Sequence, residues 1–483
     1  MTGEARAAAR ARPSDTQHSI GAFFDFDGTL IDGYSACYRE RIGRLHLGPA
    51  EAAQTLLVGL RGVSTNEQFS EAVAMSLRAW RGRSEDELTE LGERLFRQRI
   101  APAIFPEAWR LVRSHIRHGH TVVIASSATR FQVEPLARAL GVEHVLCTPT
   151  EAENGILTGR IGGPVPVAEG KAQAVRAFAA EHDIDLAQSY AYSNGDEDVP
   201  FLQTVGHPQA VNPTADLARV ASERGWPVHR FARRGRPGPS RLVRTAAGWG
   251  GVFSGFATGV VLGALNGSRR QAIDLGFSLA ADLGLALAGI DIDAQGKQHL
   301  WSQRPAVFLM NHQSGLVDVL VIVALLRGSF TVVGKKEAAN VPVIGQMLRF
   351  ADVVFVDRGN TAQAKRALAP AVDGLRAGLS LVVAPEGTRS YTPGLGPFKN
   401  GAFHVAMQAG VPVVPIVIRN AGELMWRDAK TLRPGVVRVV VHAPIPTTQW
   451  SVADLPQRVK RVRQLFIDTL DDWPRPPQEL SDA

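Results

Sequence analysis

Residues 20–30 are IGAFFDFDGTL, an apolar run that leads into two aspartates separated by one phenylalanine. The apolar run predicts a buried strand, so Asp25 and Asp27 follow its carboxyl end, where open α/β sheets bind ligands. Similar runs occur in HTVVIASSAT, residues 120–129, and in QSYAYSNGDEDVP, residues 188–200, with helical stretches between them. This alternation predicts an α/β fold with a parallel sheet covered by helices.

Residues 33–110, between the first two predicted strands, have a helical pattern. Apolar residues recur every three or four positions in TNEQFSEAVAMSLRAW and in EDELTELGERLFRQR. We therefore expect a helical cap inserted into a first domain that spans residues 19–232.

A second α/β domain is predicted over residues 292–470. Its strand-like apolar runs are RPAVFLMNH, SFTVVGKKE, ADVVFVDRG, LSLVVAPEGT, VPVVPIVI and VVRVVVHAPI. Residues 471–483 are polar and proline-rich and are expected to fray. A chain of 483 residues has room for two or three such domains.

The two domains are joined by a basic stretch and then an uncharged one. Residues 224–244 carry seven arginines and no acidic residue, and Pro237, Gly238 and Pro239 lie among them, so residues 233–245 are expected to be a flexible polybasic linker. Residues 246–268 have no charged side chain, and glycines recur at every fourth position from Gly251 to Gly267. Small residues from Gly276 to Ala288 have the same spacing, so residues 246–291 are predicted to form a closely packed helical hairpin.

Three placements of this hairpin are open. It could span a bilayer, insert shallowly as a monotopic element, or pack on its own domain in a soluble protein. The first helix has few more than the roughly 20 apolar residues that a span needs, and the second contains Asp274 and Asp282, so shallow insertion is favoured. In that placement Arg269 and Arg270, at the turn, would contact anionic headgroups.

The composition limits the function classes. The net charge of +7 indicates anionic partners, but the arginine run leads into an uncharged predicted helix, which argues against nucleic acid. Residues 1–18 are basic without an apolar segment, so they predict a disordered tail and no secretory signal. Cys37 and Cys147 have no metal-ligand spacing. The expected location is the cytoplasmic face of the membrane, peripheral or monotopic.

Side chains near three predicted strand ends could build a phosphoryl-transfer site. Asp25 and Asp27 could share Mg²⁺, with one attacking phosphorus while the other handles protons. Ser126 could bind a phosphate, Lys171 could neutralise its charge, and Asn194 and Asp198 could complete the metal site. A solvated acidic turn is the alternative for DFDGT taken alone.

Together these features resemble the haloacid dehalogenase superfamily, in its phosphoserine-phosphatase-like branch with a helical cap. The resemblance implies a Rossmann-like sheet and a phosphatase in which Asp25 forms an aspartyl-phosphate and Asp27 is the general acid/base. It implies that Ser126 and Lys171 bind the phosphoryl group, and that Mg²⁺ is held by Asp25, Asp27, Asn194 and Asp198. Asn194 stands where the family usually has an aspartate, so the amide would supply an oxygen without a charge; Asp196 could substitute for it.

A second constellation begins at Asn311-His312-Gln313-Ser314-Gly315-Leu316-Val317-Asp318. A histidine near a carboxylate can deprotonate a hydroxyl group, because the carboxylate fixes the tautomer and stabilises the imidazolium. A loop followed by a helix cap is the alternative. Arg358, Arg389 and Lys399 follow later apolar runs, and arginine forks match phosphate oxygens.

With APEGTRS at residues 384–390, this set resembles the glycerol-phosphate and lysophosphatidate acyltransferase family. The resemblance implies that His312 is the general base on the free glycerol hydroxyl and that Asp318 orients it. It implies that the glycerol phosphate is held by Arg358, Glu386, Gly387, Thr388, Arg389 and Lys399. The acyl donor would be acyl-CoA or acyl carrier protein, with no metal and no covalent enzyme intermediate.

One departure bears on the base. The family spaces His and Asp by four residues, whereas HQSGLVD has five. A loop containing Gly315 would absorb the extra residue, whereas a rigid helix would turn Asp318 away by about 100°.

The leading hypothesis is therefore a membrane-associated bifunctional enzyme. It would make phosphatidic acid from 1-acylglycerol-3-phosphate and carry a tandem Mg²⁺-dependent phosphomonoesterase domain. The alternatives are an active phosphatase with a non-catalytic lipid-binding second domain, and a non-catalytic lipid-binding scaffold.

Overall fold

The computed structural model describes residues 19–33, 74, 77–78, 80–233, 237–356 and 361–473. The chain divides into two compact units, Met1–Arg233 and Arg234–Ala483. Most of the predicted cap, the predicted N-terminal tail, residues 474–483 of the predicted C-terminal tail, Cys37 and Arg358 lie outside the described residues.

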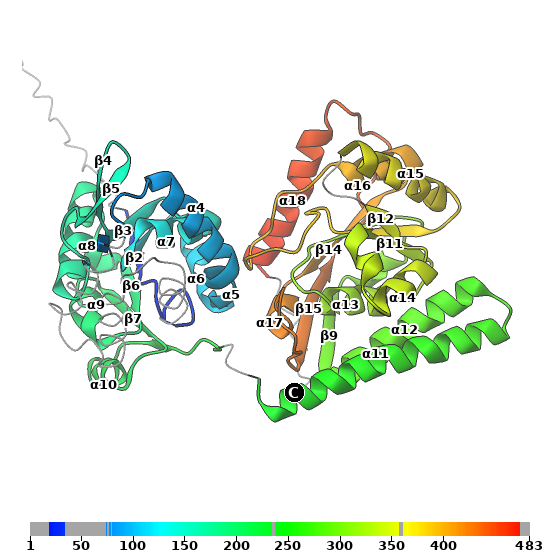
Figure 1. The fold of residues 1–483 in the computed structure, drawn as a ribbon, viewed down its shortest axis with the longest axis horizontal. Helices are drawn as coiled ribbons and strands as arrows, with labels where there is room; N and C mark the ends of the chain where they lie inside the picture. The colour runs from blue at the N-terminus through cyan, green and yellow to red at the C-terminus, as the bar shows by residue number, and fades with distance from the viewer. Residues whose placement is uncertain are drawn as a thin grey trace, which may run out of the picture. The chain divides into compact units, whose positions relative to one another are not determined.

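The N-terminal unit is built on a six-stranded parallel sheet in the order β3-β2-β1-β6-β7-β8 (Figure 1). A separate antiparallel hairpin is formed by β4 and β5. The order reverses between β1 and β6, which makes their carboxyl ends the expected ligand site of a doubly wound sheet. The strands are β1 Gly21–Phe24, β2 Thr121–Thr129, β3 His144–Thr148, β4 Thr150–Glu153, β5 Ile156–Ile161, β6 Tyr190–Ser193, β7 His207–Val211 and β8 Val228–His229.

Helices cover both faces of this sheet. Successive strand residues point to opposite faces, so Phe24 packs in one buried cluster with α5 to α7 and Phe23 in another with α8 to α10. The helices are α4 Glu85–Leu95, α5 Ala101–Ala103, α6 Pro106–Arg117, α7 Arg130–Leu140, α8 Glu169–Glu181, α9 Val199–Leu202 and α10 Ala215–Arg224. This arrangement confirms the predicted fold class.

Helix α4 is the clearest described part of the predicted cap segment. Ser84 and Glu87 form a reciprocal capping box that starts it. A turn of π-helix, Phe96–Ile100, continues it toward α5. Helix α6 instead packs on the sheet through Trp109 and Val112, so the sheet layer begins before residue 110.

The C-terminal unit is built on a seven-stranded sheet in the order β12-β11-β13-β10-β14-β15-β9. Neighbouring strands are parallel except for the antiparallel pair of β14 and β15. The strands are β9 Ile290–Gln295, β10 Val307–Met310, β11 Phe330–Lys335, β12 Val354–Val356, β13 Ser380–Val383, β14 Val413–Ile418 and β15 Gly435–Val441. Each of the six predicted apolar runs contains one of these strands, and β9 was not predicted.

This sheet also has two covered faces. Phe308 and Met310 pack with α12, α13 and α17, while Val307 and Leu309 pack with α15, α16 and α18. The helices are α11 Pro239–Leu265, α12 Arg269–Ala288, α13 Val317–Leu326, α14 Ile344–Phe350, α15 Thr361–Arg376, α16 Gly401–Ala409, α17 Ala421–Leu424 and α18 Leu455–Asp471.

Helices α11 and α12 form the predicted hairpin, side by side at the base of this unit (Figure 1). A Cβ atom on Gly255 would lie 2.5 Å from the carbonyl oxygen of Leu279, and one on Gly259 would lie 2.3 Å from the nitrogen of Gly276. The small residues therefore let the two backbones touch. Helix α11 begins at Pro239, so the second half of the predicted linker is helical.

The second helix is fixed to the rest of the unit along its length. Ala280, Ala281 and Leu285 lie in the same buried cluster as Leu320 of α13. Asp282 pairs with Arg327 at 2.5 Å, and Asp274 accepts a hydrogen bond from the backbone nitrogen of Ser329 at 3.2 Å. These two carboxylates therefore help to hold α12 against the rest of its own domain.

The arginines at the hairpin turn, expected to contact lipid headgroups, also have partners within the protein that the sequence did not indicate. Arg269 donates to both carboxylate oxygens of Asp352, at 2.6 and 2.8 Å. Arg270 pairs with Asp274 at 2.7 Å and donates to the carbonyl of Phe330 at 3.0 Å. Through these contacts the guanidinium groups of Arg269 and Arg270 hold the hairpin turn against the sheet.

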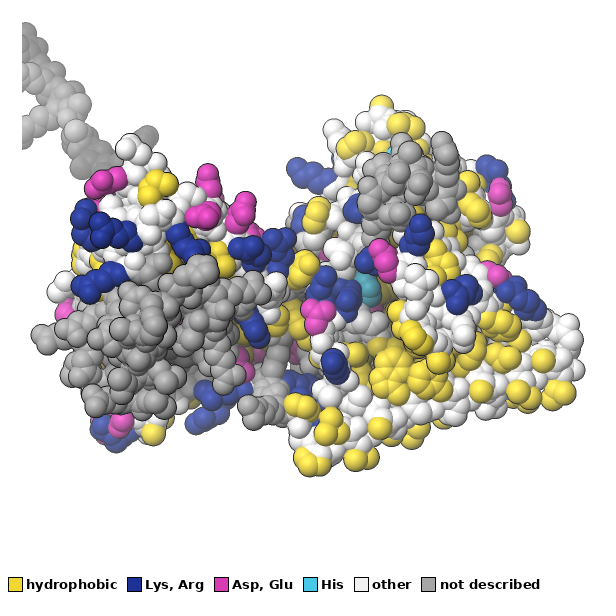
Figure 2. All heavy atoms as spheres, in the orientation of Figure 1, with side chains coloured by type: hydrophobic (Ala, Val, Ile, Leu, Met, Phe, Trp, Pro, Cys, Tyr) yellow, Lys and Arg dark blue, Asp and Glu magenta, His cyan; other side chains and the backbone are white. Residues whose placement is uncertain are grey.

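The outer side of the hairpin remains apolar and exposed. Val243, Val261 and Leu265 of α11 are 68%, 58% and 78% exposed. Figure 2 shows hydrophobic side chains spread along these two helices. Both helices are long and apolar enough to cross a membrane, with 33% and 44% of their most apolar windows buried in the protein.

Candidate functional sites

A buried ion-pair cluster lies where the order of the N-terminal sheet reverses. Lys171, on α8, places its Nζ 2.8 Å from Oδ1 of Asp25 and 2.6 Å from Oδ2 of Asp198. Asp25 follows β1, and Asp198 follows β6, which pairs with β1 in parallel register. Three predicted site residues therefore meet at one sheet edge.

The charges of this cluster are coupled. Burial raises the pKa of Asp25 to about 6, and the ammonium of Lys171 opposes the shift. Burial disfavours charged Lys171, but the carboxylates of Asp198 and Asp25 outweigh this and raise the pKa of the lysine. The lysine is therefore a permanent cation beside Asp25.

The remaining predicted residues lie around this cluster. Ser126 is buried in β2, which pairs with β1, and its Oγ accepts a hydrogen bond from the nitrogen of Ala128 at 3.1 Å. Thr29, missed in the sequence although it belongs to DFDGT, donates to Asp25 at 3.2 Å and to Oδ1 of Asn194 at 3.4 Å. Asp27 lies half-buried in the turn after β1.

The predicted magnesium ligands are oxygen donors of the kind that Mg²⁺ prefers. Oδ1 of Asp198 is buried and takes no hydrogen bond from any residue that the structure describes, which leaves it open to a cation. Within the described ranges no group of three His, Cys, Asp or Glu side chains is gathered as a metal site. The alternative ligand, Asp196, is exposed and accepts a hydrogen bond from Thr214 at 3.0 Å. The residues therefore fit a magnesium ion with the amide oxygen of Asn194 as the remaining ligand.

A buried histidine at the opposite, amino-terminal edge of the sheet gives this unit a pH dependence. His115 contacts Nδ1 of His120 and the hydroxyl of Tyr192, both at 2.8 Å. Burial, with His120 and His118 nearby, lowers the pKa of His115 to about 4, from 6.5. The unfolded chain therefore takes up a proton that the folded chain refuses as pH falls from 6.5 to 4, so stability is lost in this window.

We expect His115 to cost up to about 3 kcal/mol of stability across that window. Asp25, with its raised pKa, contributes in the opposite sense between about pH 6 and 4. The test therefore compares the parent with His115→Gln. Calorimetry at about pH 7 and about pH 5 measures how much the free energy of unfolding of each protein falls on acidification. The variant should lose less stability on acidification; equal losses would contradict this account. His207→Gln, at an exposed position on β7 that is not among the causes of the His115 shift, is the control.

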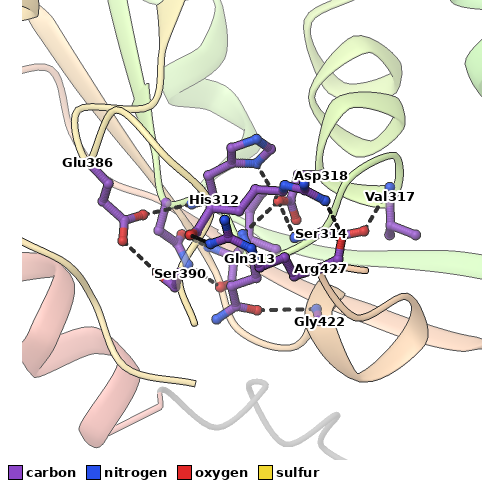
Figure 3. A network of polar contacts seen from close by, with 12 residues as sticks. His312, Gln313, Ser314, Val317, Asp318, Glu386, Ser390, Gly422 and Arg427 are labelled. Carbon is purple, nitrogen blue, oxygen red and sulfur yellow. Dashed lines mark hydrogen bonds and ion pairs between the residues drawn. The ribbon is translucent and has the colours of Figure 1, made fainter. Parts of the chain in front are cut away.

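The second predicted site is centred on His312 and Asp318 (Figure 3). Nδ1 of His312 lies 2.8 Å from Oδ2 of Asp318. The Asp318 side chain is fully buried, and the His312 side chain is 20% exposed. The imidazole is thus fixed through one nitrogen, while the ring remains accessible.

The extra residue of HQSGLVD is absorbed before the helix starts. Oδ2 of Asp318 also accepts hydrogen bonds from the backbone nitrogens of Gln313 at 2.8 Å and Ser314 at 2.7 Å. Helix α13 begins only at Val317, so Gly315 belongs to the connecting loop. The loop wraps around the carboxylate, and the dyad is intact.

Glu386 connects the loop after β13 to the dyad. Its Oε1 accepts a hydrogen bond from the nitrogen of His312 at 2.8 Å, and its Oε2 accepts from Ser390 at 2.6 Å and Gly396 at 2.8 Å. Burial raises the pKa of Glu386, and these three hydrogen bonds and nearby His312 oppose the shift. In the structure Glu386 therefore holds the backbone of the His312 loop in place. The sequence resemblance had instead implied that Glu386 binds the glycerol phosphate.

The predicted cations of this site are found in three situations. Arg389 is partly exposed and donates through Nη1 to the carbonyl of Arg427. Lys399 is exposed, and its side chain runs over Gly387, where an added Cβ would lie 3.0 Å from Nζ. Arg358 lies outside the described residues. Thr388 is exposed in the same loop.

Neighbouring strand ends bring these loops together. Asn311, after β10, exchanges two hydrogen bonds of 2.7 Å with the backbone of Ile418 at the end of β14. The nitrogen of Ser390, after β13, donates to the carbonyl of His312 at 2.8 Å. Parallel β10, β13 and β14 therefore converge on one site.

Comparisons with known proteins match both halves. Residues 22–203 match the family model of haloacid dehalogenase-like hydrolases, and residues 291–419 match the acyltransferase model. The chain is 34% identical over 286 residues to phosphoserine phosphatase SerB1 of Mycobacterium tuberculosis, which covers 56% of this chain and 87% of that protein. It is 35% identical over 198 residues to an uncharacterized acyltransferase of Schizosaccharomyces pombe, covering 39% and 71%. It is 32% identical over 192 residues to a 1-acyl-sn-glycerol-3-phosphate acyltransferase of Cocos nucifera, covering 39% and 61%.

Proposed function

Because this chain joins a member of the haloacid dehalogenase-like hydrolases to a member of the acyltransferase family, we propose that it is a bifunctional lipid enzyme. Its C-terminal unit transfers an acyl group from a thioester to the free hydroxyl of 1-acylglycerol 3-phosphate. The 2.8 Å contact between His312 and buried Asp318 carries this proposal. A rigid, oriented imidazole is what deprotonation of an alcohol requires.

The chemistry follows from the tautomer. Asp318 accepts a hydrogen bond from Nδ1 of His312, which leaves Nε2 to take the proton of the glycerol hydroxyl. The alkoxide oxygen attacks the thioester carbonyl and forms the new ester, and the carbon–sulfur bond breaks. The thiol leaves with the proton from Nε2, so His312 returns to its starting state and no acyl-enzyme is formed.

The phosphate of the acceptor lies, in this proposal, against the cations around the dyad. Arg389 supplies a planar fork and Lys399 a point charge, and Arg358 is assigned the same role from its motif. Gly387 and Thr388 line the same loop. This arrangement favours an alcohol with a dianionic phosphate over a neutral glyceride.

Transfer in detergent micelles tests the proposal. The purified chain, given radiolabelled acyl-CoA or acyl carrier protein with lysophosphatidate, should form phosphatidate. Failure with both donors would refute acyl transfer and favour a lipid-binding role for this unit beside an active phosphatase.

The N-terminal unit is proposed to release phosphate from a phosphomonoester. Asp25 attacks phosphorus, the bond to the leaving oxygen breaks, and protonated Asp27 gives its proton to that oxygen, which leaves an aspartyl-phosphate on Asp25. Asp27 then takes a proton from a water molecule whose oxygen attacks phosphorus; the bond to the Asp25 oxygen breaks, and inorganic phosphate is released. Lys171 and Ser126 hold the phosphoryl oxygens. Mg²⁺, held by Asp25, Asp27, Asn194 and Asp198, would supply charge neutralisation when bound.

Both lipids of the acyl-transfer reaction reside in a bilayer, and we propose that the hairpin lies on its cytoplasmic face. Helix α12 is docked on the domain, while α11 exposes an apolar side. Shallow, monotopic insertion through α11 accommodates both facts, whereas a span would strip α12 from its partners.

A charge on the outer side of α11 should weaken this attachment. We expect the Val261→Glu and Leu265→Glu double variant to bind anionic phospholipid vesicles at least about tenfold more weakly, because each buried charge costs on the order of 2 kcal/mol. Flotation of the protein with vesicles measures this. Val452→Glu, at a side chain 71% exposed outside the hairpin, is the matched control. Unchanged flotation of the double variant would place the membrane contact elsewhere.

A further inference from the structure

Arg427, a residue that the sequence did not single out, contacts the acyltransferase site. It follows α17, and its guanidinium stacks 3.7 Å from the ring centre of Tyr391. Its Nη1 donates to the carbonyl of Arg389 at 2.5 Å. Arg389 in turn donates through Nη1 to the carbonyl of Arg427. The two arginines therefore hold each other's backbone.

This exchange is tied to the loop that carries the dyad. The side chain of Gln313 accepts a hydrogen bond from the nitrogen of Gly422 at 3.3 Å and donates to the carbonyl of Arg419 at 3.4 Å. Figure 3 shows Arg427 beside the loop of Gln313 and Ser314. Helix α17 and the residues on either side of it thus join the loop after β10, through Gln313, to the loop after β13, through Arg427.

Gly315 makes room for the guanidinium of Arg389. A Cβ on Gly315 would lie 3.1 Å from Nη1 of Arg389, closer than side chains ordinarily pack. Gly315 lies within the segment that is one residue longer than the family spacing. The absence of a side chain at Gly315 therefore leaves space for Arg389 next to the dyad.

The charge balance indicates an anionic ligand. The guanidinium groups of Arg389 and Arg427 share one nearby carboxylate, that of Asp428, which is 72% exposed and lies 3.8 Å from the first and 3.9 Å from the second. An exposed carboxylate at that distance offsets little of the repulsion. A phosphate at Arg389 would offset more of it, because arginine forks bind phosphate oxygens in pairs.

We propose that Arg427 is a positioning residue for acceptor recognition: it fixes Arg389 against Gly315, and thereby selects an alcohol that carries a phosphate. This inference rests on the proposed acyl transfer and adds the residue that sets its acceptor class. Arg427 acts through Arg389 and touches neither the hydroxyl nor the thioester.

The test compares two acceptors, lysophosphatidate and monoacylglycerol, with the full chain in micelles. Arg427→Ala should raise KM for lysophosphatidate about tenfold, equivalent to about 1.4 kcal/mol, and leave kcat within about twofold. Transfer to monoacylglycerol should not change. Arg427→Lys, which keeps a donor for the carbonyl of Arg389, should restore part of the loss. Arg438→Ala, at an exposed position on β15, is the control.

A double variant separates positioning from general destabilisation. If Arg427 acts through Arg389, the Arg389→Ala, Arg427→Ala pair should be no worse than Arg389→Ala alone. Additive losses, equal losses with both acceptors, or an unchanged KM in Arg427→Ala would each overturn the inference. A parent enzyme that acylates neither acceptor would instead refute the proposed function. If the parent acylates lysophosphatidate but not monoacylglycerol, the two acceptors cannot be compared. The KM of the double variant for lysophosphatidate then decides whether Arg427 acts through Arg389.

Discussion

His312→Ala is expected to lower the rate of acyl transfer to lysophosphatidate by at least about 10³-fold, because the variant removes the only proposed proton acceptor for the glycerol hydroxyl. Within the described residues, the imidazole is fixed by Asp318 and its backbone by Glu386. Nothing in that arrangement replaces a lost base. The loss should appear in kcat, measured from initial rates of phosphatidate formation.

Two variants delimit this result. His404→Ala, on α16 in the same unit, should leave transfer unchanged. Asp318→Asn should also cost several orders of magnitude, because an amide in the buried position donates as well as accepts and can hold the wrong tautomer. Transfer that persists in His312→Ala would reject His312 as the base, even if Asp318→Asn is inactive.

The sequence predicted the dyad but could not decide its geometry. The five-residue spacing left Asp318 either in contact with His312 or turned away from it. The outcome depends on where α13 begins, and the backbone nitrogens of Gln313 and Ser314 bind the carboxylate before the first helical residue. These contacts are local, but their formation depends on the loop shape, which periodicity does not specify.

The contacts of Glu386 and Arg427 were beyond sequence reasoning for a different reason. Glu386 lies in a recognisable motif, yet its partners His312 and Gly396 are 74 and 10 residues away. Arg427 belongs to no pattern that carries chemistry, and only the meeting of β10, β13 and β14 brings it to the site. In the sequence WRD, residues 426–428, only Asp428 is exposed, and nothing in the triplet marks Arg427 as a site residue.

The hairpin shows the same limit. Glycines at every fourth position predicted contact between the two helices, and the packing of Gly255 and Gly259 on α12 agrees with that pattern. The docking of α12 was not predictable, because Asp282 and Arg327 are 45 residues apart. Arg269, Arg270 and Asp282 likewise have partners within the domain that their places in the sequence did not indicate.

Asp25→Asn is expected to abolish Mg²⁺-dependent phosphate release, with a loss of at least about 10³-fold, and to leave acyl transfer intact. An amide is a poor nucleophile toward phosphorus and removes one charge from the proposed metal site. Release of inorganic phosphate from a panel of phosphomonoesters measures the loss. Because Lys171 contacts both Asp25 and Asp198, the variant leaves that lysine one carboxylate partner.

Asn194 supplies a variant that should act in the opposite direction. Asn194→Asp adds a carboxylate beside Thr29 and should lower the Mg²⁺ concentration needed for half-maximal release, since a charged ligand binds a hard cation more tightly than an amide. Asp196→Asn, at an exposed position that contacts Thr214, should change neither the rate of phosphate release nor the Mg²⁺ concentration needed for half-maximal release. If the parent releases no phosphate while Asn194→Asp does, the amide alone accounts for the lost turnover. If both are silent across the panel, the buried Lys171 pair serves the stability of the sheet edge, and the N-terminal unit is not a phosphatase.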